Sequence, residues 1–314
     1  MSTGRWLRVL ALGLAGCLLL AAPVPAEEVR AAVRPPAAPA VAAEPAVWAV
    51  RDSDSTLYLF GTVHLRRPGA PWGGPVAQRA MAEAETVWLE VDPGELAPQT
   101  AGRLLQAIGF DRGRSLSTRM NPARVQQLQE TVAKLGLSMA AVELMKPWLV
   151  ASVLAMAPMQ KAGYAAENGV DRLVAEAATA AGKPISALES GEQQLRYLDG
   201  LSEPTQLAML YEALDQLDGG VDVLQAAEQA WESGDQARLR QLLIEPMAAT
   251  SPDLYQALFT DRNRRWVDRL VEVLAGSGVD FVAVGAGHLG GEGGIDALLR
   301  LRGFGVERVT SEPP

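Results

Sequence analysis

Reactive sulfur and imidazole are scarce in this 314-residue chain. Its single cysteine, Cys17, lies in an N-terminal apolar segment, so the remainder of the chain holds neither a disulfide nor a thiolate ligand for a metal. Any metal site must therefore use histidine, carboxylate, amide or backbone oxygen ligands. His64 and His288 are the two imidazoles that such a site can recruit.

Positive charge and aromatic side chains are also in short supply. The chain has 28 Lys and Arg against 37 Asp and Glu, a formal net charge of −9. A nucleic-acid-binding protein needs a basic face that displaces counterions from phosphates, and this acidic balance argues against one. Aromatic residues make up 5% of the chain, which leaves no evident platform for stacking bases or sugars. We therefore expect no nucleic-acid partner, and membrane contact only through the N-terminal segment.

Residues 1–26 are predicted to be an export signal. A short basic start precedes an apolar run at residues 7–22, which is too short for a typical membrane-spanning helix. Residues 24–26, Val-Pro-Ala, then offer the small side chains that a signal peptidase reads. A second route remains open, because the Leu-Ala-Gly-Cys segment ending at Cys17 resembles a lipobox in which that cysteine is lipidated. Both routes predict an exported protein of the periplasm or cell envelope.

The segment 27–45 is rich in alanine and proline and is predicted to be an extended linker. No similar linker follows, so residues 46–310 are interpreted as one domain. The predicted strands are residues 46–50, 56–60, 86–91, 183–188, 279–284 and 305–309. Five of them cluster at the two ends of the domain, and the pattern from 121 to 276 is otherwise mostly helical. The predicted fold class is therefore α/β, with a central mixed sheet built from both chain ends and a large helical middle region.

Both histidines occur in one pattern, in which an apolar strand leads directly into Gly-x-x-His-Leu. The pairs are Gly61 with His64, and Gly285 with His288. Glycine permits a sharp turn and lets the backbone approach a ligand closely. Since open α/β sheets bind ligands beyond the carboxyl ends of their strands, we expect both histidines and both glycines at one ligand site.

Two glutamates occupy similar positions, Glu90 near the end of the strand at 86–91 and Glu189 after the strand at 183–188. Two imidazoles with one or two carboxylates suit a divalent first-row metal that keeps a position open for water. Such a metal activates water and polarises a carbonyl, and a spare glutamate can act as general base. Structural interpretations stay open: either histidine as a hydrogen-bonded core residue, Glu90 as a buried acid held by an arginine, and Glu189 as the start of a helix.

The segment 285–290 also matches the Gly-x-Gly-x-x-Gly pattern of a dinucleotide-binding loop. Three further glycines between 291 and 294 delay the helix that should receive the pyrophosphate, and Glu307 lies inside its strand rather than at its end. These features disfavour a dinucleotide site. The chain contains no Gly-x-Ser-x-Gly elbow, no Walker A loop and no His-Glu-x-x-His motif.

Taken together, these motifs resemble the TraB/PrgY/GumN family, which includes the Tiki metalloproteases. The resemblance rests on Gly61 with His64, Glu90, Gly169-Val170-Asp171, Leu188-Glu189, Arg262-Asn263, and Gly285 with His288. It extends over residues 46–310. It implies a fold related to the erythromycin-esterase and ChaN-like proteins and a metal-dependent peptidase activity.

The resemblance also implies a role for each site residue. His64 and His288 would bind a divalent ion (manganese, cobalt or zinc), with Glu90 as third ligand or general base. Glu189, Arg262 and Asn263 would support these groups or stabilise an oxyanion. The substrate would be a peptide or another small molecule. Two alternatives are a non-catalytic envelope protein that binds a peptide or haem, with methionines of the apolar segment 147–159 lining its cleft, and a structural role in the envelope.

Overall fold

The computed structural model describes residues 44–69, 71–217 and 220–310. The predicted export signal, Cys17 and all but the last two residues of the predicted linker lie outside the described residues. Within the described ranges, no helix is both long and apolar enough to cross a membrane.

Six strands form one mixed sheet, in the spatial order β4-β3-β5-β2-β1-β6. Their bounds are β1 Val47–Arg51, β2 Ser55–Thr62, β3 Thr86–Leu89, β4 Ile185–Ala187, β5 Gly278–Gly285 and β6 Gly305–Val309. β4, β3, β5 and β2 run parallel, whereas β1 is antiparallel to both of its neighbours, β2 and β6. All six predicted strands are present, and the predicted α/β class with a sheet assembled from both chain ends is confirmed.

Most of the helices lie between β3 and β5 in the chain, whereas α2 precedes β3 and α15 follows β5. Their bounds are α2 Pro75–Glu83, α3 Pro98–Ile108, α4 Pro122–Lys134, α5 Met139–Val142, α6 Pro147–Lys161, α7 Val170–Ala180, α8 Gly191–Asp199, α9 Glu203–Asp215, α10 Gly220–Glu232, α11 Gln236–Leu239, α12 Glu245–Thr250, α13 Pro252–Tyr255, α14 Asp261–Leu274 and α15 Ile295–Leu301. The start of α4 is stabilised by its local sequence, because the Asn121 side chain accepts a hydrogen bond from the Arg124 backbone N–H and Pro122 opens the helix.

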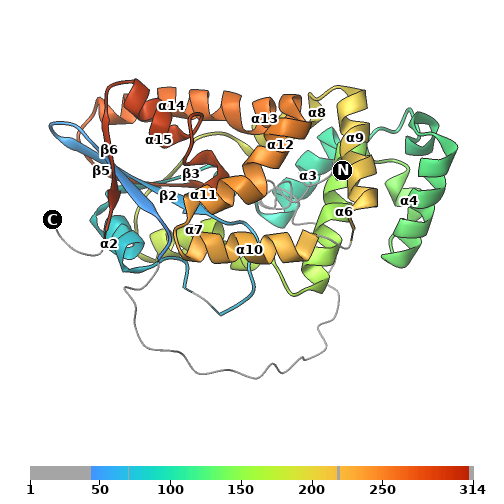
Figure 1. Cartoon of the computed structure of the whole chain (residues 1–314), viewed down its shortest axis with the longest axis horizontal. Helices are drawn as coiled ribbons and strands as arrows, with labels where there is room; N and C mark the ends of the chain where they lie inside the picture. The colour runs from blue at the N-terminus through green and yellow to red at the C-terminus, as the bar shows by residue number, and fades with distance from the viewer. Residues whose placement is uncertain (1–43, 70, 218–219, 311–314) are drawn as a thin grey trace.

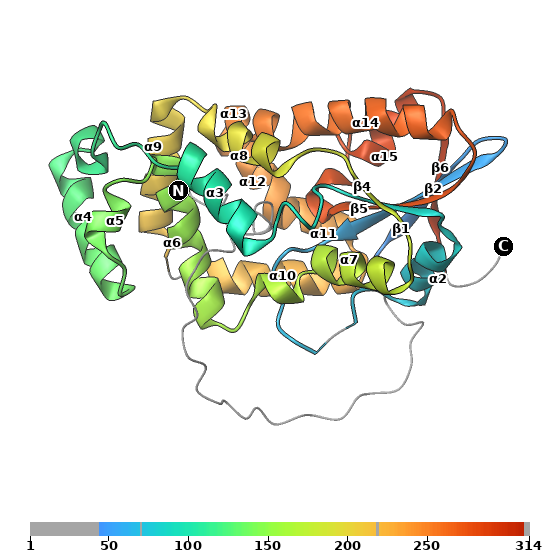
Figure 2. The same cartoon turned by 180° about the vertical axis from the view of Figure 1, so that it is seen from behind.

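Alternation along the strands gives the sheet two apolar faces. In β2, Leu57 and Leu59 point into one core cluster, and Tyr58 and Phe60 point into the other. Helices α14 and α15 cover the first face, while α2, α7 and α10 lie on the second (Figure 1). Helices α3, α4, α6, α8 and α9 extend beyond the edge of the sheet (Figures 1 and 2). The result is a three-layer sandwich whose second core continues into the helical region.

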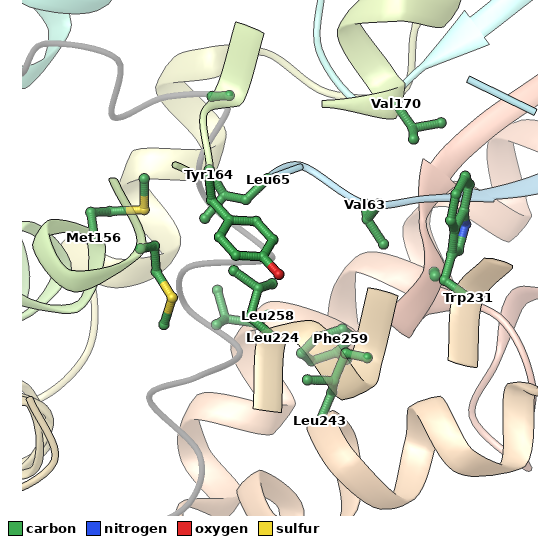
Figure 3. Close-up of a cluster of buried hydrophobic side chains, with 14 of the residues drawn as sticks. Val63, Leu65, Met156, Tyr164, Val170, Leu224, Trp231, Leu243, Leu258 and Phe259 are labelled. Atoms are coloured by element: carbon green, nitrogen blue, oxygen red, sulfur yellow. The ribbon is translucent and has the colours of Figure 1, made fainter. Parts of the chain in front are cut away.

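The apolar segment predicted at residues 147–159 forms most of α6. Met156 and Met159 are 9% and 3% exposed and belong to the core cluster, and Met156 is seen among its apolar neighbours in Figure 3. They pack among apolar side chains where the second core cluster continues into the helical region.

Two π-helical turns interrupt the long helices before β5. They are η3 Arg240–Ile244 and η4 Gln256–Thr260. The sequence predicts a helix opening at residues 251–253, and the structure shows α13, η4 and α14 as one continuous helical stretch with this wider turn inside it. The turn includes Phe259, whose ring lies 4.8 Å from the ring of His288 in the loop that follows β5.

Candidate functional site

The carboxyl ends of the four parallel strands meet at one edge of the sheet. His64 follows β2, Glu90 directly follows β3, Glu189 follows β4, and His288 ends the short 3-10 turn η5 (Ala286–His288) after β5. Parallel strands bring their ends together whatever the length of chain between them. The predicted convergence of the two histidines and two glutamates at one edge is what the structure shows.

The segment that carries His64 is held on both sides by apolar packing. Val63 and Leu65 are 4% and 0% exposed and lie among side chains from the surrounding helices (Figure 3). The first turn of α7 holds the same segment, because the Val170 backbone N–H donates to the Val63 carbonyl at 2.8 Å. His64 therefore stands on a rigid support rather than on a free loop.

The His64 ring is buried, with 6% of the residue exposed. Its Nδ1 lies 3.2 Å from Oδ1 of Asp171, in the first turn of α7. Burial would lower the pKa of His64, but the contact with the Asp171 carboxylate and the charge of Glu90 together outweigh it and leave this pKa raised above 6.5. Among the described residues, Nε2 has no hydrogen-bond partner, and the close approach of Nδ1 to Asp171 is a charge contact without hydrogen-bond geometry. A buried polar nitrogen of this kind calls for an explanation, and a ligand supplies one.

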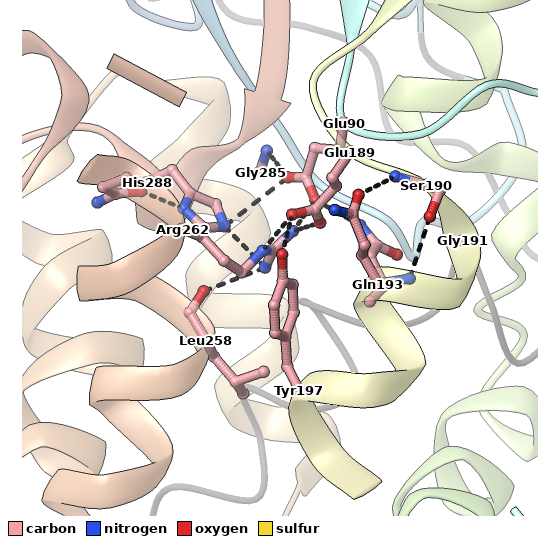
Figure 4. A network of polar contacts seen from close by, with 12 residues as sticks. Glu90, Glu189, Ser190, Gly191, Gln193, Tyr197, Leu258, Arg262, Gly285 and His288 are labelled. Atoms are coloured by element: carbon pink, nitrogen blue, oxygen red, sulfur yellow. Dashed lines mark hydrogen bonds and ion pairs between the residues drawn. The ribbon is translucent and has the colours of Figure 1, made fainter. Parts of the chain in front are cut away.

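Arg262 lies at the centre of the polar cluster (Figure 4). Its Nη2 donates at 2.6 Å to Glu90 Oε2 and at 2.6 Å to Glu189 Oε1, and its Nε donates to Glu189 Oε2 at 3.2 Å. The Tyr197 hydroxyl adds a further hydrogen bond to Glu189 at 3.0 Å. Arg262 is 1% exposed, so two buried carboxylates share one buried guanidinium. The arginine-held interpretation of Glu90 therefore describes its environment correctly.

Glu90 is ionised in this environment. Burial alone would raise its pKa, but the charge of Arg262, the nearby imidazoles and the Gly285 backbone N–H lower the pKa of Glu90 to about 2. That N–H donates to Oε1 at 2.6 Å. Gln194 of α8 donates to Oε2 at 3.0 Å. Both carboxylate oxygens are thus oriented by fixed donors.

His288 is held in one tautomer. Asn263 donates from Nδ2 to the Gly293 carbonyl at 2.7 Å, so its Oδ1 is the atom that faces His288 Nδ1, at 2.5 Å. Nδ1 must then carry the proton, and Nε2 accepts a hydrogen bond from Arg262 Nη1 at 3.2 Å. Burial and the Arg262 charge lower the pKa of His288 to about 3, which keeps the ring neutral.

Gly285 is the point on which these side chains converge. A Cβ added there would lie 3.1 Å from Glu90 Oε1, 3.3 Å from His64 Nε2 and 3.6 Å from His288 Cδ2. Glycine therefore keeps the space between the three groups free of a side chain. Gly61 differs, because its added Cβ would lie 3.0 Å from the Ala286 Cα, so this glycine lets β2 pack closely against η5. Ligand contact at either glycine stays a prediction.

A cavity of about 590 Å³ opens beside His64 and Glu90. The residues that line it are His64, Leu89, Glu90, Val91, Pro93, Leu96, Ala97, Pro98, Ala166, Asp171, Arg172, Ala175, Glu176, Thr179, Ala180 and Gln194. Arg262, Glu189 and His288 lie behind this surface. None of the methionines in the segment 145–159 lines it, so the methionine-lined cleft that motivated the haem alternative is not formed here.

The imidazoles of His64 and His288 and the carboxylate of Glu90 are side chains of the kinds that bind a divalent ion. As the side chains stand, no group of three or more His, Cys, Asp or Glu among the described residues is arranged to hold a metal. The obstacle is Arg262, whose Nη1 contacts His288 Nε2. Arg262 Nη1 also donates a hydrogen bond to the Leu258 carbonyl at 3.1 Å. Arg262 therefore keeps this partner if His288 Nε2 binds a metal instead. His288 Nε2 lies 3.8 Å from Glu90 Oε1, a spacing near that of two ligands on one ion.

Two residues of this site escaped the sequence-based assignment of roles. Asp171 appears there only as part of the Gly169-Val170-Asp171 block, and Gln194 does not appear at all. The place of Asp171 in the first turn of a helix, two residues after Gly169, was the available signal, because a carboxylate is favoured at a helix N-terminus. Nothing local marks Gln194, whose contact with Glu90 depends on how α8 packs.

Comparisons with known proteins agree with the sequence motifs. The protein YbaP of Escherichia coli (strain K12), described as uncharacterized, is 32% identical over 186 residues, which is 59% of this chain and 68% of YbaP. The YbaP protein of Shigella flexneri gives the same values. No solved structure matches the chain significantly, so the expected likeness to erythromycin-esterase and ChaN-like proteins stays a prediction. The sequence model of one family matches residues 46–308, and the chain belongs to that family, TraB/PrgY/gumN.

Proposed function

We propose that this protein is a metal-dependent hydrolase of peptide or similar amide bonds that acts in the cell envelope. The observation that carries the proposal is the convergence of His64 Nε2, Glu90 Oε1 and the edge of the His288 ring on Gly285, with His288 Nε2 3.8 Å from Glu90 Oε1. The envelope location rests on the N-terminal sequence alone.

The three groups match a catalytic metal site in chemistry. Two imidazoles and one carboxylate are a common ligand set that leaves a coordination position for substrate or water. A divalent ion bound there would supply Lewis acidity toward an amide carbonyl. The outer nitrogens of both rings contact side-chain oxygens, those of Asp171 and Asn263, which is the arrangement that orients histidine ligands.

The charge state of Glu90 favours the role of ligand over that of general base. A general base works best with a pKa near the operating pH, whereas the pKa of Glu90 is about 2. An ionised carboxylate held by Gln194 and Arg262 presents Oε1 in a constant position. Arg262 and Glu189 lie behind the cavity surface, so we assign them to positioning Glu90 and His288 rather than to touching substrate.

Metal analysis of the purified protein tests the proposal. The wild type, the His64→Ala/His288→Ala double variant and a Glu176→Gln control are incubated with manganese, cobalt or zinc and desalted. Glu176 lines the same cavity but lies outside the proposed ligand set. We expect about one ion per chain in the wild type and the control, and none in the double variant. The same samples are then assayed against a quenched-fluorescent peptide library. Equal metal content in all three proteins, or no cleavage by metal-loaded wild type, would overturn the proposal.

One observation favours a second candidate, a binding protein without catalysis. Arg262 already compensates Glu90 and Glu189 and contacts His288, so the cluster is electrostatically satisfied by the chain itself. A peptide or haem would then bind in the cavity without turnover. Saturable binding by metal-free protein with no cleavage product would support this candidate, and a Soret shift lost in His64→Ala would identify haem.

A further inference from the structure

The cavity has a polar end and an apolar body. Its polar end is formed by His64, Glu90, Asp171 and Gln194, which belong to the proposed metal site or contact it. Most of the remaining lining is apolar. At about 590 Å³ the cavity lies within the range of ligand pockets, roughly 300–1,000 Å³, and exceeds what one reacting amide group needs. A substrate whose scissile bond reaches the polar end must therefore place a neighbouring part in the apolar body.

Two walls shape this apolar body. One wall consists of the end of β3 and the chain leading into α3, where Leu89 and Val91 are 4% exposed and Leu96 is half-buried. The other is helix α7, which presents short side chains, among them Ala175 and Ala180. Both elements are visible in Figure 2. Short side chains on α7 leave width for a bulky group, and the opposite wall supplies apolar surface for it.

The charge of the lining restricts which group can enter. Three carboxylates, those of Glu90, Asp171 and Glu176, face a single guanidinium, that of Arg172. Arg172 is itself paired with Glu176 at 3.0 Å. Glu90 is paired with Arg262 behind the cavity surface, so Asp171 is the carboxylate of the three for which no arginine partner is found among the described residues. An acidic substrate group would be brought close to Asp171, so the cavity disfavours it. The same argument disfavours a free fatty acid as occupant of the metal-free protein.

We propose that this cavity is the specificity site of the enzyme and takes the bulky apolar side chains of a peptide segment next to the scissile bond. The expected effect on cleavage rests on the hydrolase function proposed above, whereas the expected effect on peptide binding rests on the cavity alone. Leucine or phenylalanine in that position is preferred, and aspartate is rejected.

Binding to metal-free protein tests the cavity separately from catalysis. Fluorescein-labelled hexapeptides that differ only in their two central residues (Leu-Phe, Asn-Asn or Asp-Asp) are titrated by fluorescence anisotropy. Burial of a large apolar side chain corresponds to a preference of roughly tenfold or more, so Leu-Phe should bind at least tenfold tighter than Asn-Asn, with Asp-Asp weakest. Equal affinities for the three peptides would overturn the proposal.

Variants locate the bound peptide. Ala175→Leu fills the cavity from α7, and Leu96→Asn makes the opposite wall polar. Each should weaken binding of the Leu-Phe peptide about tenfold while leaving the weak binding of the Asn-Asn peptide unchanged. Ala123→Leu is the matched control, because Ala123 is exposed on α4 and does not line the cavity. Circular dichroism confirms folding, and Leu96→Asn retains the test if Ala175→Leu does not fold. Unchanged binding in the folded variants would place the peptide elsewhere.

The cleavage arm separates the two proposals. With metal-loaded wild type, we expect the Leu-Phe peptide to be cut and the Asp-Asp peptide to be spared. Selective binding without any cleavage would reject the hydrolase and retain the cavity as a binding site. Cleavage that ignores the central residues would reject the specificity site and retain the hydrolase.

Discussion

Arg262 determines the electrostatics of the site at the scale of single residues. It is the positively charged side chain that contacts both buried glutamates, and its own burial is tolerated because Glu189 and Glu90 raise its pKa further above the usual value. Two carboxylates against one guanidinium leave one net negative charge on Arg262, Glu90 and Glu189, and the neutral ring of His288 does not offset it. A divalent cation close to Glu90 would be attracted by that excess.

We expect Arg262→Met to destabilise the protein by roughly 3–5 kcal/mol at neutral pH, because it leaves two buried carboxylates without their partner. Urea unfolding followed by circular dichroism measures the change. Arg264→Met on the same helix is the control, since the Arg264 side chain is 66% exposed and its ion pair with Asp261 is long, at 3.9 Å. That exposed pair should contribute at most about 1 kcal/mol. Similar losses in the two variants would contradict the central role of Arg262.

His288 predicts an acid-sensitive fold. Its pKa is about 3 in the folded chain against 6.5 ordinarily, so between these values the unfolded chain binds more protons. Unfolding should therefore become easier by roughly 1.4 kcal/mol for each pH unit on acidification through this window. Glu90, lowered from 4.5 to about 2, adds to the same trend at lower pH. His64 acts in the opposite direction, because its pKa is raised, but its stabilising effect is complete once the pH falls below 6.5.

Urea unfolding at a series of pH values between about 7 and 4 measures this dependence. His288→Gln removes the titrating ring and should flatten the slope. A slope in this variant as steep as that of the wild type would show that other groups cause the acid sensitivity.

At the scale of elements, the start of α7 positions both His64 and its carboxylate partner. Gly169 is the N-cap residue of this helix, and a Cβ added to it would lie 2.6 Å from the His64 carbonyl oxygen. Glycine thus permits the close contact that brings Asp171 to the imidazole. Gly287 in η5 permits a similar close approach. A Cβ added there would lie 2.8 Å from side-chain atoms of Ile244 and Phe259, which belong to the two π-helical turns η3 and η4.

We expect Gly169→Ala to push α7 away from the His64 segment. Steric overlap of this kind costs about 1–3 kcal/mol, and displacement of Asp171 should weaken metal binding about tenfold or more. Thermal unfolding and metal titration check the two effects. Gly182→Ala is not an equivalent control, because its φ of +67° adds backbone strain, so Ala177→Gly within α7 serves instead. Its cost should be confined to helix propensity, about 1 kcal/mol, with metal affinity unchanged.

At the scale of the whole molecule, strands from both chain ends and the helical middle share their apolar contacts. One core cluster contains Val47 of β1, Trp148 of α6, Trp231 of α10 and Phe281 of β5. The register places Val47 opposite Val309, so the first and last strands of the domain are neighbours. Neither the sheet nor the helical region can bury its apolar surface alone.

We therefore expect residues 44–310 to unfold in one cooperative transition, and residues 98–274 by themselves not to fold. Tryptophan fluorescence and far-UV circular dichroism should give coincident urea transitions, since Trp88 reports on the sheet and Trp148 on the helical region. Two separate transitions, or a folded fragment, would contradict the interpretation of residues 46–310 as one domain.

The strands and the two glycine-histidine motifs were determined by the sequence itself. Alternation in β2, the apolar run of β5 and the Gly-x-x-His-Leu segments are local patterns, and neighbouring residues suffice to define them. Their common place at the carboxyl edge of the sheet also follows, because parallel strands share that edge. The resemblance to the family assigned Glu90, Glu189, Arg262 and Asn263 to the same site, but it did not specify which side chains contact one another.

Only the tertiary structure decided those contacts. Arg262 reaches Glu90 across 172 residues of sequence and Glu189 across 73, and Gln194 reaches Glu90 across 104. Such pairings depend on the strand order β4-β3-β5-β2 and on how α7, α8 and α14 pack against it, and no local pattern encodes either. The apolar cavity has the same origin, because its two walls come from separate elements, the chain leading into α3 and helix α7. Hydrophobic burial specifies which side chains are inside, whereas packing of the assembled elements specifies which of them meet.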